Sequence, residues 1–308
     1  MPDHAAQPFV SIVILNWNNA EDTLACLGSV AALDYPAARV IVVDNGSTDD
    51  SAARIRAAYP DVELIETGEN LGYAGGNNVG VRHALAQGAE YVCILNNDVI
   101  VDPGFLGPLV GALQAEADVG IVGPKVYQLD APAEIQSAGG ILDDKFDVQW
   151  RGAGEKDQGQ LDEAAEIDVA HGCALVLRRQ LLKALSGFDE RFFMYREEVD
   201  LCVRAKQVGY RVFYAPQARV WHRRPNVMAS RQAFTTYYMT RNTYLLLSNS
   251  QANIASYARV ALRHLVWLLN WSVNAKWRHR REDRDALFKA LIDSVGRKYG
   301  NRAYRYGI

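Results

Sequence analysis

The sequence predicts an α/β fold: a Rossmann-like, mixed but mainly parallel sheet with helices on both faces, plus a C-terminal helical appendage. In the first hundred residues, short runs of β-branched and aliphatic residues alternate with helical segments, as in the βαβ units of parallel sheets. Beyond Phe234 only helical patterns remain. The 308 residues are 49% apolar, so the chain can bury a sizeable core.

Each element of the first half has its own signal. Runs rich in valine, isoleucine and leucine predict strands at 10–15, 40–43, 62–65, 91–95 and 99–101. Apolar residues at helical spacing predict helices at 21–32, 51–58 and about 78–87. The glycine- and asparagine-rich segment 69–78 is expected to be a loop before the third helix.

The second half is less regular until residue 234. Short strands and glycine-rich turns are expected over 121–150, and a surface loop over 151–168. Apolar runs predict further strands at 169–177, 212–214 and 219–221, with Pro216 between the last two. A helix is predicted over 197–208. We expect a domain over 1–234, with parts at about 8–120 and 121–234, and a helical region over 235–308 that associates with a membrane or forms a homodimer.

Composition excludes several classes of protein. Cys26, Cys93, Cys173 and Cys202 have no CxxC spacing and lie in apolar sequence, which indicates reduced core thiols. No leader-like segment follows Met1, which favours a cytoplasmic location. The net charge of −3 is unevenly spread: residues 241–308 carry 13 Lys/Arg and 4 Asp/Glu, so the rest carries −12. The basic tail indicates either an anionic membrane surface or a solvated helix face, and no nucleic-acid partner is expected.

Polar residues stand where three of the predicted strands end. These segments are Asn16-Trp17-Asn18, Asp44-Asn45-Gly46 and Asn96-Asn97-Asp98. In α/β sheets, ligands bind just beyond the carboxyl ends of parallel strands. The sequence has neither GxGxxG after the first strand nor a Walker GxxxxGK[ST], which argues against NAD-dependent redox chemistry and P-loop phosphoryl transfer.

The residue types at these ends suit a nucleotide. Trp17 between two amides could form a wall for a planar base, and the Asp44 carboxylate could accept the N3–H of uracil or thymine. Gly72, Gly75 and Gly76, within the segment that contains Asn70 and Asn77, could let backbone N–H groups approach a ligand. Each segment also has a purely structural interpretation, as an Asx turn or a cap of the following helix.

Seven segments together resemble a known family. "VSIVILNWNN", "VVDNGSTDDS", "ENLGYAGGNNVG", "ILNNDV", "HGCALVLRR", "GFDERFFMYREEVDLCVRAKQVGY" and "VWHRR" occur in the order typical of inverting family 2 glycosyltransferases, in particular the rhamnosyltransferase-like branch. The resemblance covers roughly residues 8–250 and implies a GT-A-type nucleotide-sugar-binding fold. It makes the part at 8–120 nucleotide-binding and the part at 121–234 acceptor-binding and catalytic.

The resemblance implies a metal site. Asn96-Asn97-Asp98 stands in the place of the family's Asp-x-Asp motif, whose last carboxylate binds Mg²⁺ or Mn²⁺ at the donor diphosphate. Asp98 is then the main ligand, and His222 matches a histidine that completes the metal sphere. Asn96 replaces the first acidic residue, so one formal charge is lost. The donor site would include Asn16, Asn96 and Asn97. Trp17 would lie against the base, and Asp44 would read that base. The pocket of the donor would be lined by Asn70 and Asn77.

The resemblance also implies a catalytic base. An inverting transfer needs a group that takes the proton from the acceptor hydroxyl. Glu198 stands where the family usually has Asp, and adjacent Glu197 is the alternative. A helix N-terminus favours ionised carboxylates, which suits a base. Arg223, Arg224 and Arg241 are candidates for diphosphate or acceptor contacts.

The sequence thus predicts a metal-dependent inverting glycosyltransferase that uses a UDP- or dTDP-sugar, with dTDP-rhamnose one candidate. Its acceptor would be a glycan or a polyprenyl-linked saccharide of the cell surface, met at the inner face of the cell membrane. Two alternatives remain open at this point: a sugar-nucleotide-binding protein without turnover, and a nucleotidyltransferase with a related sheet. The second would be expected to carry a Gly/Arg/Lys-rich loop where Asn16-Trp17-Asn18 stands.

Overall fold

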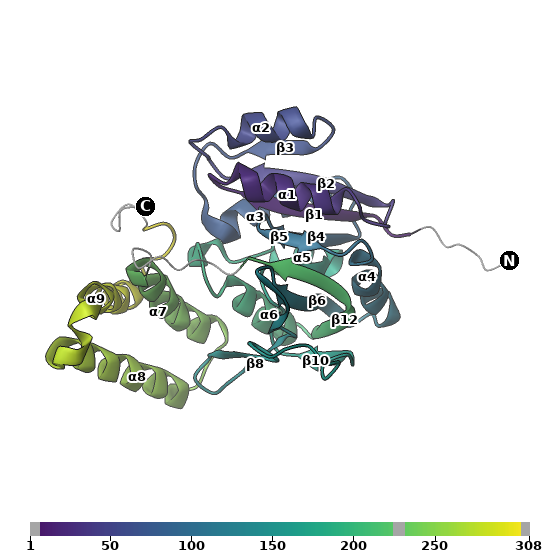
Figure 1. Cartoon of the computed structure of the whole chain (residues 1–308). Coiled ribbons are helices and arrows are strands. Elements are labelled where there is room, and N and C mark those ends of the chain that lie inside the picture. Colours follow the sequence, from purple (N-terminus) through teal and green to yellow (C-terminus); the bar gives the residue numbers. More distant parts are fainter. Residues whose placement is uncertain (1–6, 224–231, 303–308) are drawn as a thin grey trace.

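The computed structural model describes residues 7–223 and 232–302. A large mixed sheet forms its centre, with helices on both faces (Figure 1). In spatial order its strands are β10 (Ala165–Ile167), β12 (Arg211–His222), β6 (Val119–Gln128), β11 (Ala174–Arg178), β4 (Tyr91–Asn96), β1 (Val10–Asn16), β2 (Ala38–Asp44) and β3 (Glu63–Glu66). The short strand β5 (Val99–Val101) pairs with β12, and β7 (Ala131–Ser137) pairs with β6. Strands β8 (Gly140–Leu142) and β9 (Val148–Trp150) form a separate hairpin.

The first part of the sheet is parallel, and its strands β1 and β4 are buried on both faces. Strands β3, β2, β1 and β4 pair in parallel, whereas β11 is antiparallel to both β4 and β6. Because side chains alternate along a strand, Val13 lies in the core on one face and Ile12 and Ile14 on the other. The first face is covered by α3 (Gly72–Ala86), α5 (Arg179–Leu185) and α6 (Glu197–Gln207). The second is covered by α1 (Ala20–Val30), α2 (Ser51–Ala58) and α4 (Leu106–Ala115).

The structure corrects several predicted boundaries. The segment predicted as a loop at 69–78 is helical from Gly72, which has a φ of +73° and whose added Cβ would collide with Phe193. Pro216 does not separate two strands, because β12 runs through it with an irregular register against β6. The strand predicted at 169–177 begins only at Ala174, and the predicted surface loop at 151–168 contains β10. All four cysteines are buried and free, as predicted.

Three helices form the appendage: α7 (Gln232–Asn249), α8 (Ile254–Val273) and α9 (Arg281–Val295), with the 3₁₀ segment η3 (Ala275–Arg280) between the last two (Figure 1). Asn242 of α7 donates to the carbonyls of Phe192, Met194 and Tyr195 at 3.0, 2.8 and 2.7 Å. The appendage is therefore attached directly to the chain segment before α6. Within the described residues, no helix is long and apolar enough to cross a membrane.

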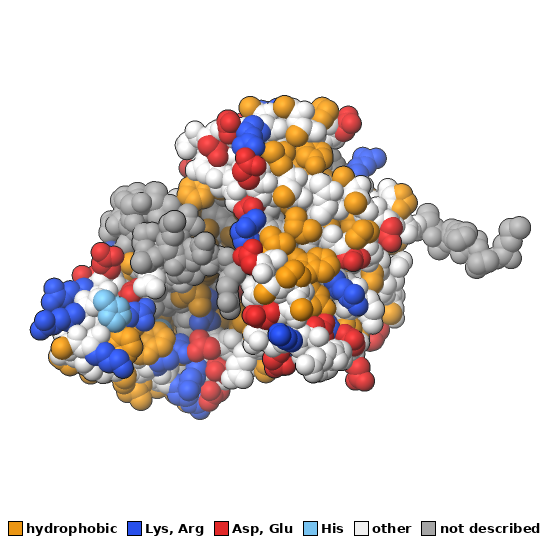
Figure 2. Space-filling model, viewed as in Figure 1, with side chains coloured by type: hydrophobic (Ala, Val, Ile, Leu, Met, Phe, Trp, Pro, Cys, Tyr) orange, Lys and Arg blue, Asp and Glu red, His pale blue; other side chains and the backbone are white. Residues whose placement is uncertain are grey.

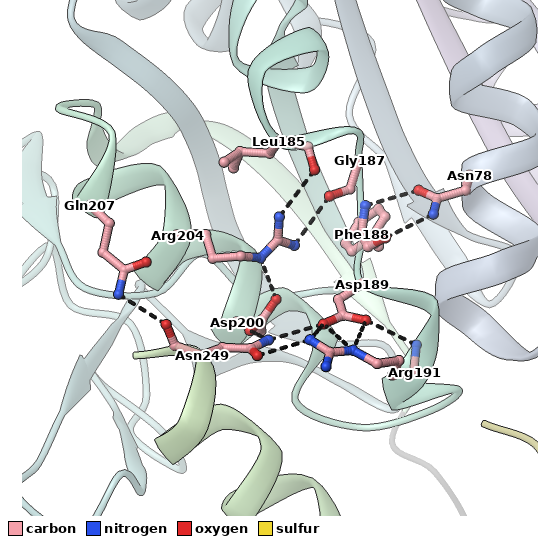
Figure 3. A network of polar contacts seen from close by, with 10 residues as sticks. All are labelled: Asn78, Leu185, Gly187, Phe188, Asp189, Arg191, Asp200, Arg204, Gln207 and Asn249. Carbon is pink, nitrogen blue, oxygen red and sulfur yellow. Dashed lines mark hydrogen bonds and ion pairs between the residues drawn. The ribbon is translucent and has the colours of Figure 1, made fainter. Parts of the chain in front are cut away.

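A second polar network joins α6 to the elements packed around it (Figure 3). Asp200 is fully buried and accepts from Arg204 Nε at 2.6 Å and from Asn249 Nδ2 of α7 at 2.7 Å. Asn249 also donates to Asp189, next to the short 3₁₀ turn η1 (Glu190–Phe192). Arg204 in turn donates to the carbonyls of Leu185 and Gly187 at 3.3 and 3.1 Å. The network thus fixes α6 between α5 and α7. The two glutamates that are candidates for the base stand at the start of α6.

Candidate active site

The ends of β1 and β2 are joined by their polar side chains. The parallel register places Asn16 beside Asp44, and Asn16 Nδ2 donates to Asp44 Oδ1 at 2.7 Å and to Ser47 Oγ at 3.2 Å. Asn16 Oδ1 accepts from Thr23 at 2.8 Å, so every polar group of this buried amide is engaged. Asp44 also accepts from Ser47 N at 3.1 Å and is 2% exposed. Asn16 therefore positions Asp44, while Asp44 remains the candidate for reading a base.

The other predicted donor-site residues lie nearby in the fold, with structural contacts of their own. Trp17 is partly exposed at the end of β1. Asn70 Oδ1 accepts from Gly72 N at 2.8 Å at the start of α3, and from Asn45 Nδ2 at 3.2 Å. Asn77 is buried; its amide donates to Tyr73 O at 3.0 Å, and its Oδ1 has no hydrogen-bond donor among the described residues. Their contact with a nucleotide stays a prediction.

Strand pairing brings Asp98 to His222. Val99 of β5 lies opposite His222 of β12, so the preceding Asp98 meets the end of β12. Asp98 Oδ1 lies 3.2 Å from His222 Nε2. Next to it, Asn97 donates to Thr23 Oγ1 at 2.9 Å, and Asn96 N donates to Cys173 O at 2.8 Å. The predicted pair Asp98 and His222 is therefore brought together from residues 124 positions apart in the sequence.

The pair suits a cation. His222 is buried, and its Nδ1 lies 3.0 Å from Gln136 Oε1, which can only accept, so Nδ1 carries a proton. In neutral His222, Nε2 then turns a lone pair toward Asp98 Oδ1, a buried oxygen with no hydrogen-bond donor among residues 7–223 and 232–302. Two lone pairs at this distance require a proton or a metal ion between them. The carboxylate oxygen favours a hard cation such as Mg²⁺ or Mn²⁺, and the Gln136 bond fixes the imidazole as metal ligands are often fixed.

Two residues without a predicted catalytic or binding role, His171 and Cys173, lie beside His222. The ligand atoms of His171, Cys173 and His222 lie within 4.8 Å of one another. His171 Nδ1 accepts from Cys173 N at 3.2 Å, so in the neutral ring Nε2 carries the proton and His171 is a hydrogen-bond donor. Burial, together with His222, lowers the pKa of His171 to about 3, so the ring is neutral. The sequence signal was the segment "HGC", which the resemblance included without assigning a role.

The predicted base lies on the other side of the loop that contains His171 and Cys173. Glu197 and Glu198 open α6, and the side chain of Glu198 packs so closely on Gly172 that a Cβ there would lie 3.3 Å from Glu198 Cγ. Glu198 is partly exposed, whereas Glu197 is buried. The loop with His171 therefore connects Glu198 to the Asp98–His222 pair.

The pKa values of the two glutamates shift in the direction opposite to that expected at a helix N-terminus. Burial raises the pKa of both carboxyls, well above its usual range for Glu197, where the charge of Glu198 adds to the effect. The expected stabilisation of the ionised forms by the helix N-terminus is thus outweighed by loss of hydration. A raised pKa suits a base that must hold the proton it accepts.

Of the three candidate arginines, two lie within the described residues, and their surroundings differ. Arg223 is exposed and pairs with Asp22 at 3.1 Å beside the strand ends. Arg224 lies outside the described residues. Arg241 is fully buried, and it donates to the carbonyls of Phe192 and Gly300 at 2.7 and 2.8 Å. The prediction of a ligand contact for Arg241 is therefore wrong, because its buried guanidinium joins α7 to the segment before α6 and to Gly300.

Two solved structures share the architecture of this chain. A mannosyltransferase from Pyrobaculum calidifontis, in complex with GDP-Man and Mn²⁺, aligns with a TM-score of 0.58 at 18% identity over 97% of this chain and 90% of its own. GalNAc-T7 with UDP, GalNAc and Mn²⁺ aligns with a TM-score of 0.68 at 15% identity, over 96% of this chain and 59% of its own. The fold is therefore the GT-A type, as predicted.

Sequence relatives agree with the fold. The hexosyltransferase Agl10 of low-salt glycan biosynthesis from Haloferax volcanii is 26% identical over 78% of this chain and 76% of its own. The N-acetylglucosaminyl-diphospho-decaprenol L-rhamnosyltransferase of Mycobacterium tuberculosis is 27% identical over 88% of each chain. Residues 11–186 match the profile of Glycosyl transferase family 2. This match covers more than half of the chain, and the protein is a glycosyltransferase that belongs to family 2.

Proposed function

We propose that the protein transfers rhamnose, with inversion, from dTDP-rhamnose to a lipid-linked saccharide, and that the reaction depends on Mg²⁺ or Mn²⁺. The observation that carries this proposal is the joint placement of the Asp98–His222 pair and Glu198 on the two sides of the loop with His171. One end of this arrangement suits a diphosphate with its cation, and the other suits an acceptor hydroxyl.

The donor half of the site follows from the strand ends. Asp44, held by Asn16 and Ser47, would accept the N3–H of the thymine or uracil ring, and Trp17 would lie against the ring face. Asp98 and His222 would hold the divalent cation. When bound, this cation would offset the negative charge of the departing nucleoside diphosphate. The neutral His171, with Nε2 as a donor, would add a hydrogen bond on the same side.

The acceptor half follows from the first turn of α6. Glu198 would take the proton from the attacking hydroxyl, which approaches the anomeric carbon opposite to the leaving group. Tyr73 donates to Gly172 O at 2.5 Å and fixes the loop on which Glu198 packs. Glu197 is buried beside it and would act through position and charge.

The acceptor and the sugar are proposed from the relatives. The mycobacterial relative is named as a rhamnosyltransferase that acts on a diphospho-decaprenol-linked sugar, and it spans nearly the same length as this chain. A lipid-linked acceptor also fits the exposed apolar residues on one side of α8, Leu262, Leu265, Leu269 and Val273, beside a basic segment at 276–284. This side of α8 would rest on the anionic inner surface of a membrane.

The test is a transfer assay with the purified chain. dTDP-rhamnose, UDP-glucose and GDP-mannose are each offered with Mg²⁺ or with EDTA to a short-chain prenyl diphospho-N-acetylglucosamine. The expected result is metal-dependent transfer from dTDP-rhamnose, and NMR of the product should show the inverted anomer. Transfer that is equal with EDTA, or a product of retained configuration, contradicts the proposal. Binding of dTDP-rhamnose without any transfer or donor hydrolysis would favour the binding-protein alternative.

A further inference from the structure

The loop before β11 brings three metal-binding side chains together. One ligand atom from each of His171, Cys173 and His222 lies within 4.8 Å of the other two, and the two imidazole rings have their centroids 5.6 Å apart. No second group of three such side chains occurs in residues 7–223 and 232–302. Under the proposed function His222 holds the cation and His171 donates a hydrogen bond, which leaves the thiol of Cys173 without a role.

The surroundings of this group differ from those of the charged side chains on the surface. On the face shown in Figure 2, acidic side chains are scattered, and several stand beside basic ones, as expected for ion pairs. Cys173 and His222 are instead buried, with 2% and 5% of their surfaces exposed, whereas His171 is partly exposed. The group is therefore enclosed by the protein, and His171 forms its side nearest to solvent.

Main-chain contacts hold the loop in place. Tyr73 donates to Gly172 O at 2.5 Å, and Asn96 N donates to Cys173 O at 2.8 Å. Because these contacts use main-chain oxygens of the loop, an ion can bind the side chains without unfolding it. His171 Nδ1 accepts from Cys173 N at 3.2 Å, and a metal ion on the neutral ring would take its one lone pair in place of this long bond.

The donor set favours zinc over magnesium. A thiolate and two imidazoles are typical ligands of Zn²⁺, whereas Mg²⁺ prefers oxygen. With Zn–N of about 2.0–2.1 Å and Zn–S of about 2.3 Å, ligand atoms in a tetrahedral site lie about 3.3–3.6 Å apart, so each atom here would move by about 1 Å or less. The thiol proton of Cys173 would pass to solvent as the Zn–S bond forms.

Zinc in this group and the cation of the donor site would compete for one nitrogen. His222 Nδ1 is bound to Gln136, so only Nε2 offers a lone pair, and that atom lies 3.2 Å from Asp98 Oδ1. One lone pair binds one metal ion. An ion held by His171, Cys173 and His222 therefore removes the nitrogen that Mg²⁺ or Mn²⁺ would use.

We infer that His171, Cys173 and His222 form a binding site for Zn²⁺, and that zinc bound there inhibits transfer by taking His222 away from Asp98. The inhibition rests on the proposed function, because it requires a reaction that uses a cation at Asp98 and His222. The binding of zinc does not rest on it. Cys173 is then the residue that makes the enzyme sensitive to zinc.

Co²⁺, a spectroscopic substitute for Zn²⁺, tests the site without donor or acceptor. The full chain is freed of metal with a chelator, which is then removed, and is titrated with CoCl₂ in the presence of a non-thiol reductant. We expect a sulfur-to-cobalt charge-transfer band in the near ultraviolet, which requires a thiolate ligand, and its loss when Zn²⁺ is added. Cys173→Ala should remove the band. It should also raise the Kd for Zn²⁺ by at least the roughly 10–100-fold that is typical when a partner of a metal ligand is lost.

Two further variants make the test specific. Cys202→Ala removes another buried, free thiol, from α6, and should keep both the cobalt band and the Kd for Zn²⁺. His171→Asn, at a partly exposed position, should weaken Zn²⁺ binding while its side-chain oxygen can still accept from Cys173 N. Thermal unfolding of the metal-free chains checks that each variant folds.

The outcomes separate the inference from the proposed function. Absence of the charge-transfer band in the unaltered chain would overturn the inference, as would a band that survives in Cys173→Ala or a Kd for Zn²⁺ that neither Cys173→Ala nor His171→Asn alters. In the transfer assay, Zn²⁺ should inhibit the unaltered chain in competition with Mg²⁺, and zinc that binds the group without inhibiting transfer would refute the competition for His222. If no transfer occurs under any condition while the cobalt results hold, the zinc site stands and only the proposed function is rejected.

Discussion

Replacing Glu198 by Gln gives the sharpest test of the catalytic assignment. The amide keeps the size of the side chain and its packing on Gly172, but it cannot accept the proton of the acceptor hydroxyl. General-base catalysis contributes about 10²–10⁴-fold, which corresponds to about 2.7–5.4 kcal/mol of barrier at about 1.36 kcal/mol per tenfold. Donor affinity should be unchanged, because Asp44 lies at the end of β2 and Asp98 lies between β4 and β5, both outside α6.

The pH dependence provides a second readout. Burial raises the pKa of Glu198, and the base works in its deprotonated form, so the rate should rise with pH through a pKa above the ordinary value of about 4.3. Initial rates of transfer at saturating donor, from pH 4 to 9, should show this acidic limb in the unaltered enzyme and lose it in Glu198→Gln.

The neighbouring carboxylate is the control. Glu197→Gln should change the rate less than tenfold, since Glu197 is buried and would act only through position and charge. Glu198→Asp shortens the side chain by one methylene and should retain part of the activity. Normal turnover of Glu198→Gln with loss in Glu197→Gln would show that the roles are reversed, and normal turnover of both would place the base elsewhere.

Three further predictions concern the metal site, the polar network around Asp200 and the helical appendage. Calorimetric titration should show that dTDP binds more tightly with Mg²⁺ than with EDTA, and that Asp98→Ala removes this difference; equal affinity in the unaltered chain would refute the metal site. Arg204→Met leaves the fully buried Asp200 without its charged partner and should lower the free energy of unfolding by about 3 kcal/mol in urea titrations, and a loss below about 1 kcal/mol would contradict this reasoning. Co-sedimentation at low salt should show a preference for anionic over neutral vesicles, and Leu265→Gln/Leu269→Gln should weaken it; equal binding to both kinds of vesicle would reject the membrane contact.

The sequence was sufficient for the centre of the parallel half of the sheet because β1 and β4 are buried on both faces. Unbroken aliphatic runs are then required, and polar residues can stand only at their ends, which is why Asp44 and Asp98 were found. The start of α3 could not be predicted in the same way. Three glycines in its first five positions argue against a helix, but they are required by close contacts, as at Gly76 with Leu15 and Asn45.

Tertiary contacts explain the remaining differences. His222 was recognised through the family resemblance, but its bond to Gln136 comes from β7, which no local pattern connects to it. His171 gains a role only because β11 brings its loop between β4 and α6. Arg241 was a candidate for a diphosphate or acceptor contact, and only the packing of Tyr237 and Tyr238 around it shows that it is interior. The protonation of Glu197 likewise depends on burial, which charge patterns do not report.

The position of Arg241 also limits how such enzymes can be recombined. Its guanidinium is bound to carbonyls of Arg191, Phe192 and Gly300, and Asn242 is bound to those of Met194 and Tyr195. A chimera that exchanged only the appendage between two relatives would separate these donors from the carbonyls with which they evolved. The segment 188–200 would have to move with the appendage, and it includes the proposed base. Changes of acceptor and changes in the catalytic segment are therefore expected to be inherited together, whereas the nucleotide-binding half can diverge on its own.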